Sequence, residues 1–162
     1  MWWSKQLLFA GSFLLLISCG YKPIYGPSGL ATSLDGNLSI EAPTDRAGYV
    51  LYHHLDNRLK DSDDGKYNLS FSISETSSRA AIDENGRAHR ALLEGVATYD
   101  LRRASDNKTI IKGRVHGFTG YSTLAASVAS HASSRDATQR LMSMLADKIV
   151  YELVIAADKG DF

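Results

Sequence analysis

The segment Tyr67-Asn68-Leu69-Ser70-Phe71-Ser72-Ile73-Ser74 alternates large apolar and small polar side chains without a break. A period of two is typical of a β-strand with one buried and one polar face. The sequence therefore predicts a sheet that is covered by apolar packing on one face. Its other face is expected to lie in water or against a partner.

Upstream of this strand, residues 37–42 alternate in the same way and predict a short strand that ends at Pro43. Thr44 or Asp45 can cap a following helix. Leucines recur every fourth residue in the next segment and predict a helix over residues 46–60. A strand, a helix and a second strand in this order imply a parallel pair of strands.

Downstream, residues 76–86 show no periodicity and predict a loop. Residues 93–101 and 109–121 alternate again, with a hairpin turn over 105–108 between them. From Arg135 onward, apolar residues recur at helical spacing. The predicted fold is α+β: a two-layer sandwich in which two helices pack on one face of a mixed four-stranded sheet, in the order β-α-β-β-β-α.

The N-terminus has the three parts of a secretory signal peptide. Lys5 is its one charge, Leu7 to Ile17 is an apolar run, and Leu16-Ile17-Ser18-Cys19 follows. The run is shorter than the roughly twenty apolar residues that span a bilayer. The last four residues resemble the lipobox of bacterial lipoproteins, which predicts a lipidated Cys19. The alternative is an ordinary signal followed by an incidental cysteine.

These features divide the chain into four predicted segments. They are a signal peptide (1–18), a lipidated N-terminus with an extended tether (19–35), the sandwich domain (36–157) and a polar tail (158–162). Cys19 is the only cysteine, so no disulfide forms within the chain. Eighteen basic side chains balance eighteen acidic ones. Without the signal, the net charge is about −1, so no general basic field draws the protein to nucleic acid.

The sequence offers no constellation for catalysis. It contains no G-x-S-x-G, Walker or H-E-x-x-H motif. His89 and His116 lie on neighbouring predicted strands and could face each other, but a zinc site would need two further ligands. Tyr99 and Tyr121 are expected to be core aromatics with solvated hydroxyls. We expect no enzyme activity, no cofactor and no metal.

Basic residues are the most informative polar group. Arg79, Arg87 and Arg90 surround the predicted loop, and Lys112 and Arg114 alternate on the last strand. If the hairpin pairs as predicted, these five side chains could form one cationic patch suited to phosphate oxygens. Alternatively, the charges only keep a sheet face soluble and discourage edge pairing.

The segment Cys19-Gly20-Tyr21-Lys22-Pro23-Ile24-Tyr25-Gly26 resembles the mature N-terminus of the lipopolysaccharide-assembly lipoprotein LptE in its alphaproteobacterial form. The Ala97-x-Tyr99-x-Leu101 strand and the Asp136-Ala137 opening of the last helix are also similar. The resemblance implies an outer-membrane lipoprotein, anchored through its acylated N-terminus on the periplasmic side. It also implies a plug and assembly partner of the β-barrel LptD that contacts lipopolysaccharide. The five basic residues above are the candidates for that contact.

Two other functions stay open at this point. A lipoprotein that carries a small apolar or anionic ligand would need an enclosed apolar pocket between helices and sheet. A cell-envelope hydrolase would need a cluster of perturbed titratable groups in a cleft.

Overall fold

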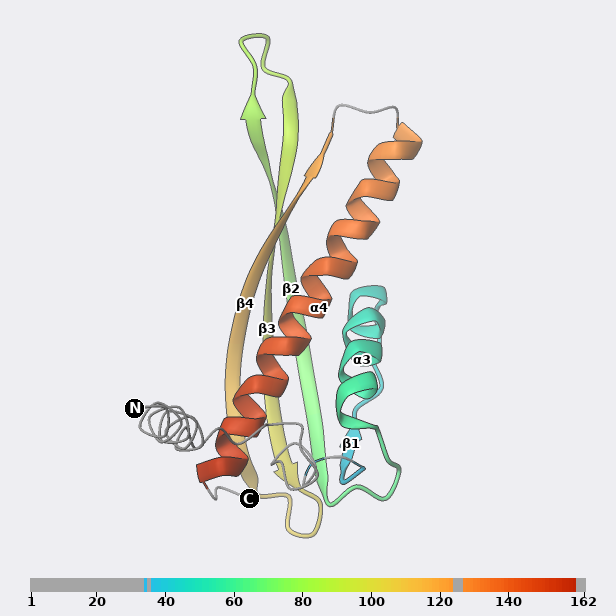
Figure 1. The fold of residues 1–162 in the computed structure, drawn as a ribbon, viewed down its shortest axis with the longest axis vertical. Coiled ribbons are helices and arrows are strands. Elements are labelled where there is room, and N and C mark those ends of the chain that lie inside the picture. Colours follow the sequence, from blue (N-terminus) through green and yellow to red (C-terminus); the bar gives the residue numbers. More distant parts are fainter. Residues whose placement is uncertain (1–33, 35, 124–126, 160–162) are drawn as a thin grey trace, which may run out of the picture.

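The computed structural model describes residue 34 and residues 36–123 and 127–159, so the predicted signal, Cys19 and all of the predicted tether except Leu34 lie outside the described residues. The elements follow the predicted order: β1 (Leu38–Ile40), α3 (Arg46–Leu59), β2 (Tyr67–Ile82), β3 (Ala88–Arg103), β4 (Thr109–Ser122) and α4 (Ser127–Lys159). The four strands form one sheet in the order β1-β2-β3-β4. Both helices lie on the same face of it (Figure 1). The predicted α+β sandwich is confirmed.

Strand pairing also follows the prediction. β1 runs parallel to β2 for three residues, from the pair Leu38–Tyr67 to the pair Ile40–Leu69. The pairs β2–β3 and β3–β4 are antiparallel. The long hairpin of β2 and β3 extends well past α3, so the sheet is tall while its cover is shorter (Figure 1).

The loop predicted over residues 76–86 is wrong, because β2 continues to Ile82 and pairs with β3 from Thr76–Glu94 to Ile82–Ala88. Pairing with a strong neighbouring strand overrides the weak pattern of this polar segment. Only a short turn remains. Asp83 stabilises that turn, since its Oδ1 accepts the amides of Asn85 and Arg87 at 2.9 and 2.8 Å.

Helix α3 begins where the sequence indicates. Asp45 is its N-cap and accepts the amide of Gly48 at 3.3 Å. The helix buries one apolar stripe against the sheet and α4, formed by Leu51, Leu55 and Leu59. At its outer end, Arg58 bonds Asp147 of α4 at 2.6 Å. This exposed pair orients the two helices more than it stabilises them.

Helix α4 is longer than predicted. It starts at Ser127, eight residues before Arg135, and continues to Lys159, two residues into the predicted polar tail. At 33 residues it is about 50 Å long. Its Ser- and Ala-rich first turns carry no apolar periodicity, which is why the spacing of leucines located only its second half. None of the described helices is both long enough and apolar enough to cross a membrane.

The core lies where α4 crosses the middle of the sheet. Gly95 and Gly117 are cross-strand neighbours on β3 and β4, and Leu141 lies directly over them. A β-carbon on Gly95 would be 2.8 Å from Leu141 Cδ2, closer than real atoms approach. The two glycines therefore let the helix backbone approach the sheet, and leucine fills the space that their side chains leave.

Asp61, which follows α3, joins β1 and α3 at the lower end of the sandwich. Its carboxylate accepts the Ile40 amide of β1 at 2.8 Å and the Tyr52 hydroxyl of α3 at 2.6 Å. The hydrogen bond to Asp61, helped by partial burial and nearby acids, raises the pKa of Tyr52 to about 12.

This shift predicts a stability change at alkaline pH. Tyr52 keeps its proton in the folded protein after the unfolded chain has lost it at a pKa near 10. The stabilisation is therefore complete below pH 10 and is lost as the pH rises to 12. We expect the difference in melting temperature between wild type and Tyr52→Phe to be constant from pH 7 to 9 and to shrink above pH 10. A difference that does not change up to pH 12 would contradict the assignment.

Candidate functional site

The sheet face opposite the helices is uncovered in the described part of the chain and is mostly polar, with Leu92, Val96 and Phe118 as its apolar residues. On β2 this face carries a line of hydroxyl side chains, since even-numbered residues point away from the helices: Ser70, Ser72, Ser74, Thr76 and Ser78. On β4 the same face carries Lys112, Arg114 and His116, followed by Phe118, whose side chain is 65% exposed. This open sheet face is wide enough to meet a large partner.

The five candidate basic residues do not form one patch. Lys112 and Arg114 are neighbours on the open sheet face, about 7 Å apart along β4. Arg90 is on the same face but pairs with Ser122, about 26 Å from Arg114. Arg79 points to the helix side, opposite Ala91, and Arg87 lies in the turn of the long hairpin.

Near Lys112 and Arg114, the positive charge on the open sheet face is partly balanced. Lys112 is the cross-strand neighbour of Asp100, and Asp100 already binds Arg102 at 2.8 Å. The hydrogen bonds that Arg102 donates to Asp100, and the negative charge of that carboxylate, raise the pKa of Arg102. Arg114 faces only Thr98 and Ser72 across the strands, so it is the cation most available to an anionic ligand.

The two histidines do not face each other. His116 pairs with Val96 on the open sheet face, whereas His89 lies near Thr123 at the far end of the sheet and on its other side. His89 instead bonds Asp83 at 2.9 Å, which together with the turn amides lowers the pKa of Asp83. No group of three potential metal ligands occurs among residues 34, 36–123 and 127–159.

Tyr99 is a core aromatic, as predicted, but its hydroxyl is not solvated. The side chain is 1% exposed and donates to the carboxylate of Glu152 on α4. Burial and this hydrogen bond raise the pKa of Tyr99. The ring lies against Gly113, where a β-carbon would be 2.6 Å from its Cζ. The pair fixes the lower half of α4 to the sheet and has no access to a substrate. Tyr121 is half-buried against the core.

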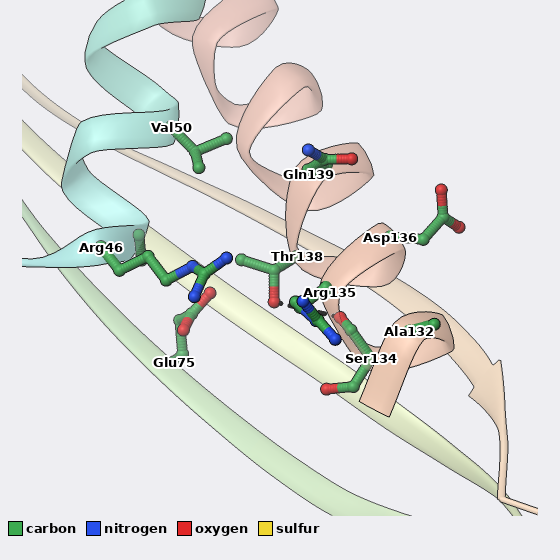
Figure 2. A pocket seen from close by; sticks show the side chains of 10 residues that line it. Arg46, Val50, Glu75, Ala132, Ser134, Arg135, Asp136, Thr138 and Gln139 are labelled. Atoms are coloured by element: carbon green, nitrogen blue, oxygen red, sulfur yellow. Dashed lines mark hydrogen bonds between the residues drawn. The ribbon is translucent and has the colours of Figure 1, made fainter. Parts of the chain in front are cut away.

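A cleft of about 590 Å³ opens where α3 and α4 separate above β2 (Figure 2). Two arginines, Arg46 and Arg135, lie beside it together with Glu75. The rest of the lining is polar residues of α4 and three apolar residues of the two helices: Ser134, Asp136, Thr138, Gln139, Ala47, Val50 and Ala132. The cleft itself partly desolvates Glu75, and together with the carboxylate of Asp45 it raises the pKa of that acid. These residues come from three separate segments, so no local motif indicated them.

The cleft does not match the pocket that a carrier of small apolar ligands requires. It is open to solvent, and charged and polar side chains lie among the apolar ones of its lining. Below it, the space between helices and sheet is filled by buried side chains, including Leu55, Leu69, Leu101, Leu145 and Ile149. The described residues therefore offer surfaces rather than an enclosed apolar chamber.

Comparison with known proteins gives likeness of fold rather than of sequence. No known sequence family and no curated protein matches the chain. Among solved structures, a candidate lipoprotein from Caulobacter crescentus is 24% identical with a TM-score of 0.70, covering 82% of this chain and 98% of that one. Rare lipoprotein B from Shewanella oneidensis has a TM-score of 0.58 at 11% identity and covers 78% and 98%.

A minor lipoprotein from Acinetobacter baumannii is also similar, with a TM-score of 0.51 at 19% identity, covering 75% of this chain and 90% of its own. The structural similarity covers nearly the whole length of all three proteins. The chain therefore has the fold of these small lipoproteins over its whole described domain.

Proposed function

We propose that this protein is an outer-membrane lipoprotein that serves as plug and assembly partner of an LptD-like β-barrel in lipopolysaccharide transport. The observation that carries the proposal is the fold, which lipoproteins of three other bacteria share over most of their length. The lipobox-like segment ending at Cys19 and the LptE-like start of the mature chain are consistent with it. The proposed role is non-catalytic and needs no cofactor or metal.

The open sheet face suits such a partner. Its hydroxyl line and cations are compatible with the hydrated, polar interior of a large barrel, where an apolar face would be unfavourable. The helix face buries the core and holds the sheet rigid behind that surface. Docking therefore requires no opening of the domain.

The test is co-purification from native membranes. Tagged protein is extracted from outer membranes in mild detergent, and bound proteins are identified by mass spectrometry. We expect a β-barrel of much larger mass in near-equal amount. Repeated recovery of a free monomer would overturn the proposal. A chain lacking the tag is the background control.

The positions of the five basic residues in the sheet predict which of them contact lipopolysaccharide. Lys112 and Arg114 project side by side and can bind one phosphate together, whereas Arg79 and Arg90 diverge onto opposite faces. We expect Lys112→Glu/Arg114→Glu to weaken binding of purified lipopolysaccharide about tenfold. The triple change of Arg79, Arg87 and Arg90 to glutamate is expected to weaken it less. Binding that depends mainly on the triple set would contradict this assignment.

A further inference from the structure

The sheet has two edges, and they differ in whether side chains bond their outward main-chain groups. Consecutive residues of a β-strand direct their main-chain N–H and C=O groups alternately to the two sides. β4 is one edge of the sheet. β2 is the other edge wherever β1 does not cover it, because β1 pairs only with residues 67–69.

Helix α4 caps the β4 edge at two outward carbonyls. Lys148 Nζ donates to the outward carbonyl of His116 at 2.5 Å, and Arg140 Nη2 donates to that of Gly120 at 3.2 Å. Two cations about two helical turns apart thus occupy acceptors that another strand would need. Such capping is a known way to prevent edge-to-edge pairing.

In the described part of the chain, no side chain caps the β2 edge in this way. The Tyr67 amide donates to Asn37 at 3.1 Å and the Leu69 carbonyl accepts the Glu41 amide at 2.9 Å, so odd-numbered residues of β2 point their main-chain groups outward. The series continues through Phe71, Ile73, Glu75, Ser77 and Arg79. Among the described residues, none bonds these outward groups. The stretch without main-chain partners is about 26 Å long. At Phe71 and Ile73 it is flanked by residues 41–45, with a pocket between the two segments.

The cleft between α3 and α4 lies directly beside this open edge (Figure 2). Arg46 and Glu75 point toward each other across it. Asp136 turns away and bonds Arg140 at 2.9 Å. Arg135 donates only to the His131 carbonyl, at 3.3 Å. Glu75 and Asp45 lie at the Arg46 end of the cleft, and among the described residues no carboxylate forms an ion pair with Arg135.

We infer that residues 71–79 of β2 are a strand-addition site for an extended segment of another polypeptide that carries an acidic side chain opposite Arg135. The outward main-chain groups supply the hydrogen bonds, and the cleft receives alternate side chains of the added strand. The guanidinium selects the acid. A second copy of this chain is disfavoured, since antiparallel pairing centred on this stretch would place Glu75 opposite Glu75.

Two matched substitutions at Ser77 isolate the contribution of main-chain hydrogen bonds to binding of the added strand. Ser77→Pro removes an outward N–H and leaves the ladder to β3 intact, because proline is tolerated at a free edge. Ser77→Ala keeps that N–H and is the control. We expect both variants to melt within about 2 °C of wild type, since an exposed change away from the core costs little. Ser78→Pro, whose N–H faces β3, should melt far lower.

Binding is read in intact cells with a photo-crosslinking amino acid at Arg79, an exposed position on β2 whose side chain points to the helix side of the sheet and not to the open sheet face. We expect an adduct with a second polypeptide that maps to an extended segment containing Asp or Glu. Ser77→Pro and Arg135→Glu should each reduce it at least tenfold, and Ser77→Ala should leave it unchanged. No adduct, an adduct insensitive to Ser77→Pro, or one with residues 20–33 of this same chain would overturn the inference.

The outcome also separates this inference from the proposed function. An adduct with a protein that is not a barrel would leave the strand-addition site standing and count against the barrel partner. A barrel that co-purifies equally with wild type and Ser77→Pro would do the reverse.

Discussion

Replacing Cys19 with alanine is expected to move the protein from the outer membrane to the soluble periplasm, or to leave it as uncleaved precursor. The predicted signal is too short to anchor the chain by itself, so the acyl groups on Cys19 would supply the attachment. Each buried methylene contributes about 0.8 kcal/mol, and two or more chains hold a protein stably where one does not. Loss of the thiol should therefore change localisation almost completely.

Cell fractionation with immunoblotting measures this effect. Ser28→Ala, in the predicted tether, is the matched control and should stay in the membrane fraction. Mass spectrometry of the wild-type N-terminal peptide should show an acylated cysteine as first residue. Membrane recovery of Cys19→Ala at wild-type level, or an unmodified thiol on the mature protein, would contradict the lipid anchor.

The second large effect is expected in the core. Leu141 is fully buried over Gly95 and Gly117, where the helix and the two strands are closest. Leu141→Ala removes its contacts and leaves a cavity that the glycine backbone cannot fill. We expect a loss of about 3 kcal/mol in the free energy of unfolding. The corresponding fall in melting temperature is about 10 °C.

Val128→Ala on the same helix is the control, because that side chain is 78% exposed. It should change the stability by no more than about 0.5 kcal/mol. Chemical denaturation of both variants gives the two values directly. Equal losses for Leu141→Ala and Val128→Ala would show that α4 does not cross the sheet at the glycine pair.

Elements with a strong periodicity of apolar residues could be predicted from the sequence. The alternation in residues 67–74 and the leucines of α3 predicted the sheet, the helix and their order, because side-chain direction follows directly from backbone period. The cap at Asp45 was equally local. The upper half of β2 and the first two turns of α4 were not readable, since polar segments take their conformation from the partner beside them.

The candidate site was only partly predictable. The sequence indicated basic residues on the right strands, but register decided that Lys112 and Arg114 lie together while Arg79 and Arg90 part. The cleft beside Arg46 and Arg135 depends on the angle between two helices far apart in the chain. The contrast between the capped β4 edge and the open β2 edge depends on where α4 places Arg140 and Lys148.

By itself, the sequence determined the signal-like N-terminus with its single cysteine, the order of strands and helices, and the existence of one polar sheet face. These features rest on composition and on periods that each segment carries within itself. Only the tertiary structure decided which charges are neighbours, which edge of the sheet is open and where a cleft forms. Those properties arise from contacts between residues distant in the chain, and the backbone period of one segment carries no information about its distant partner.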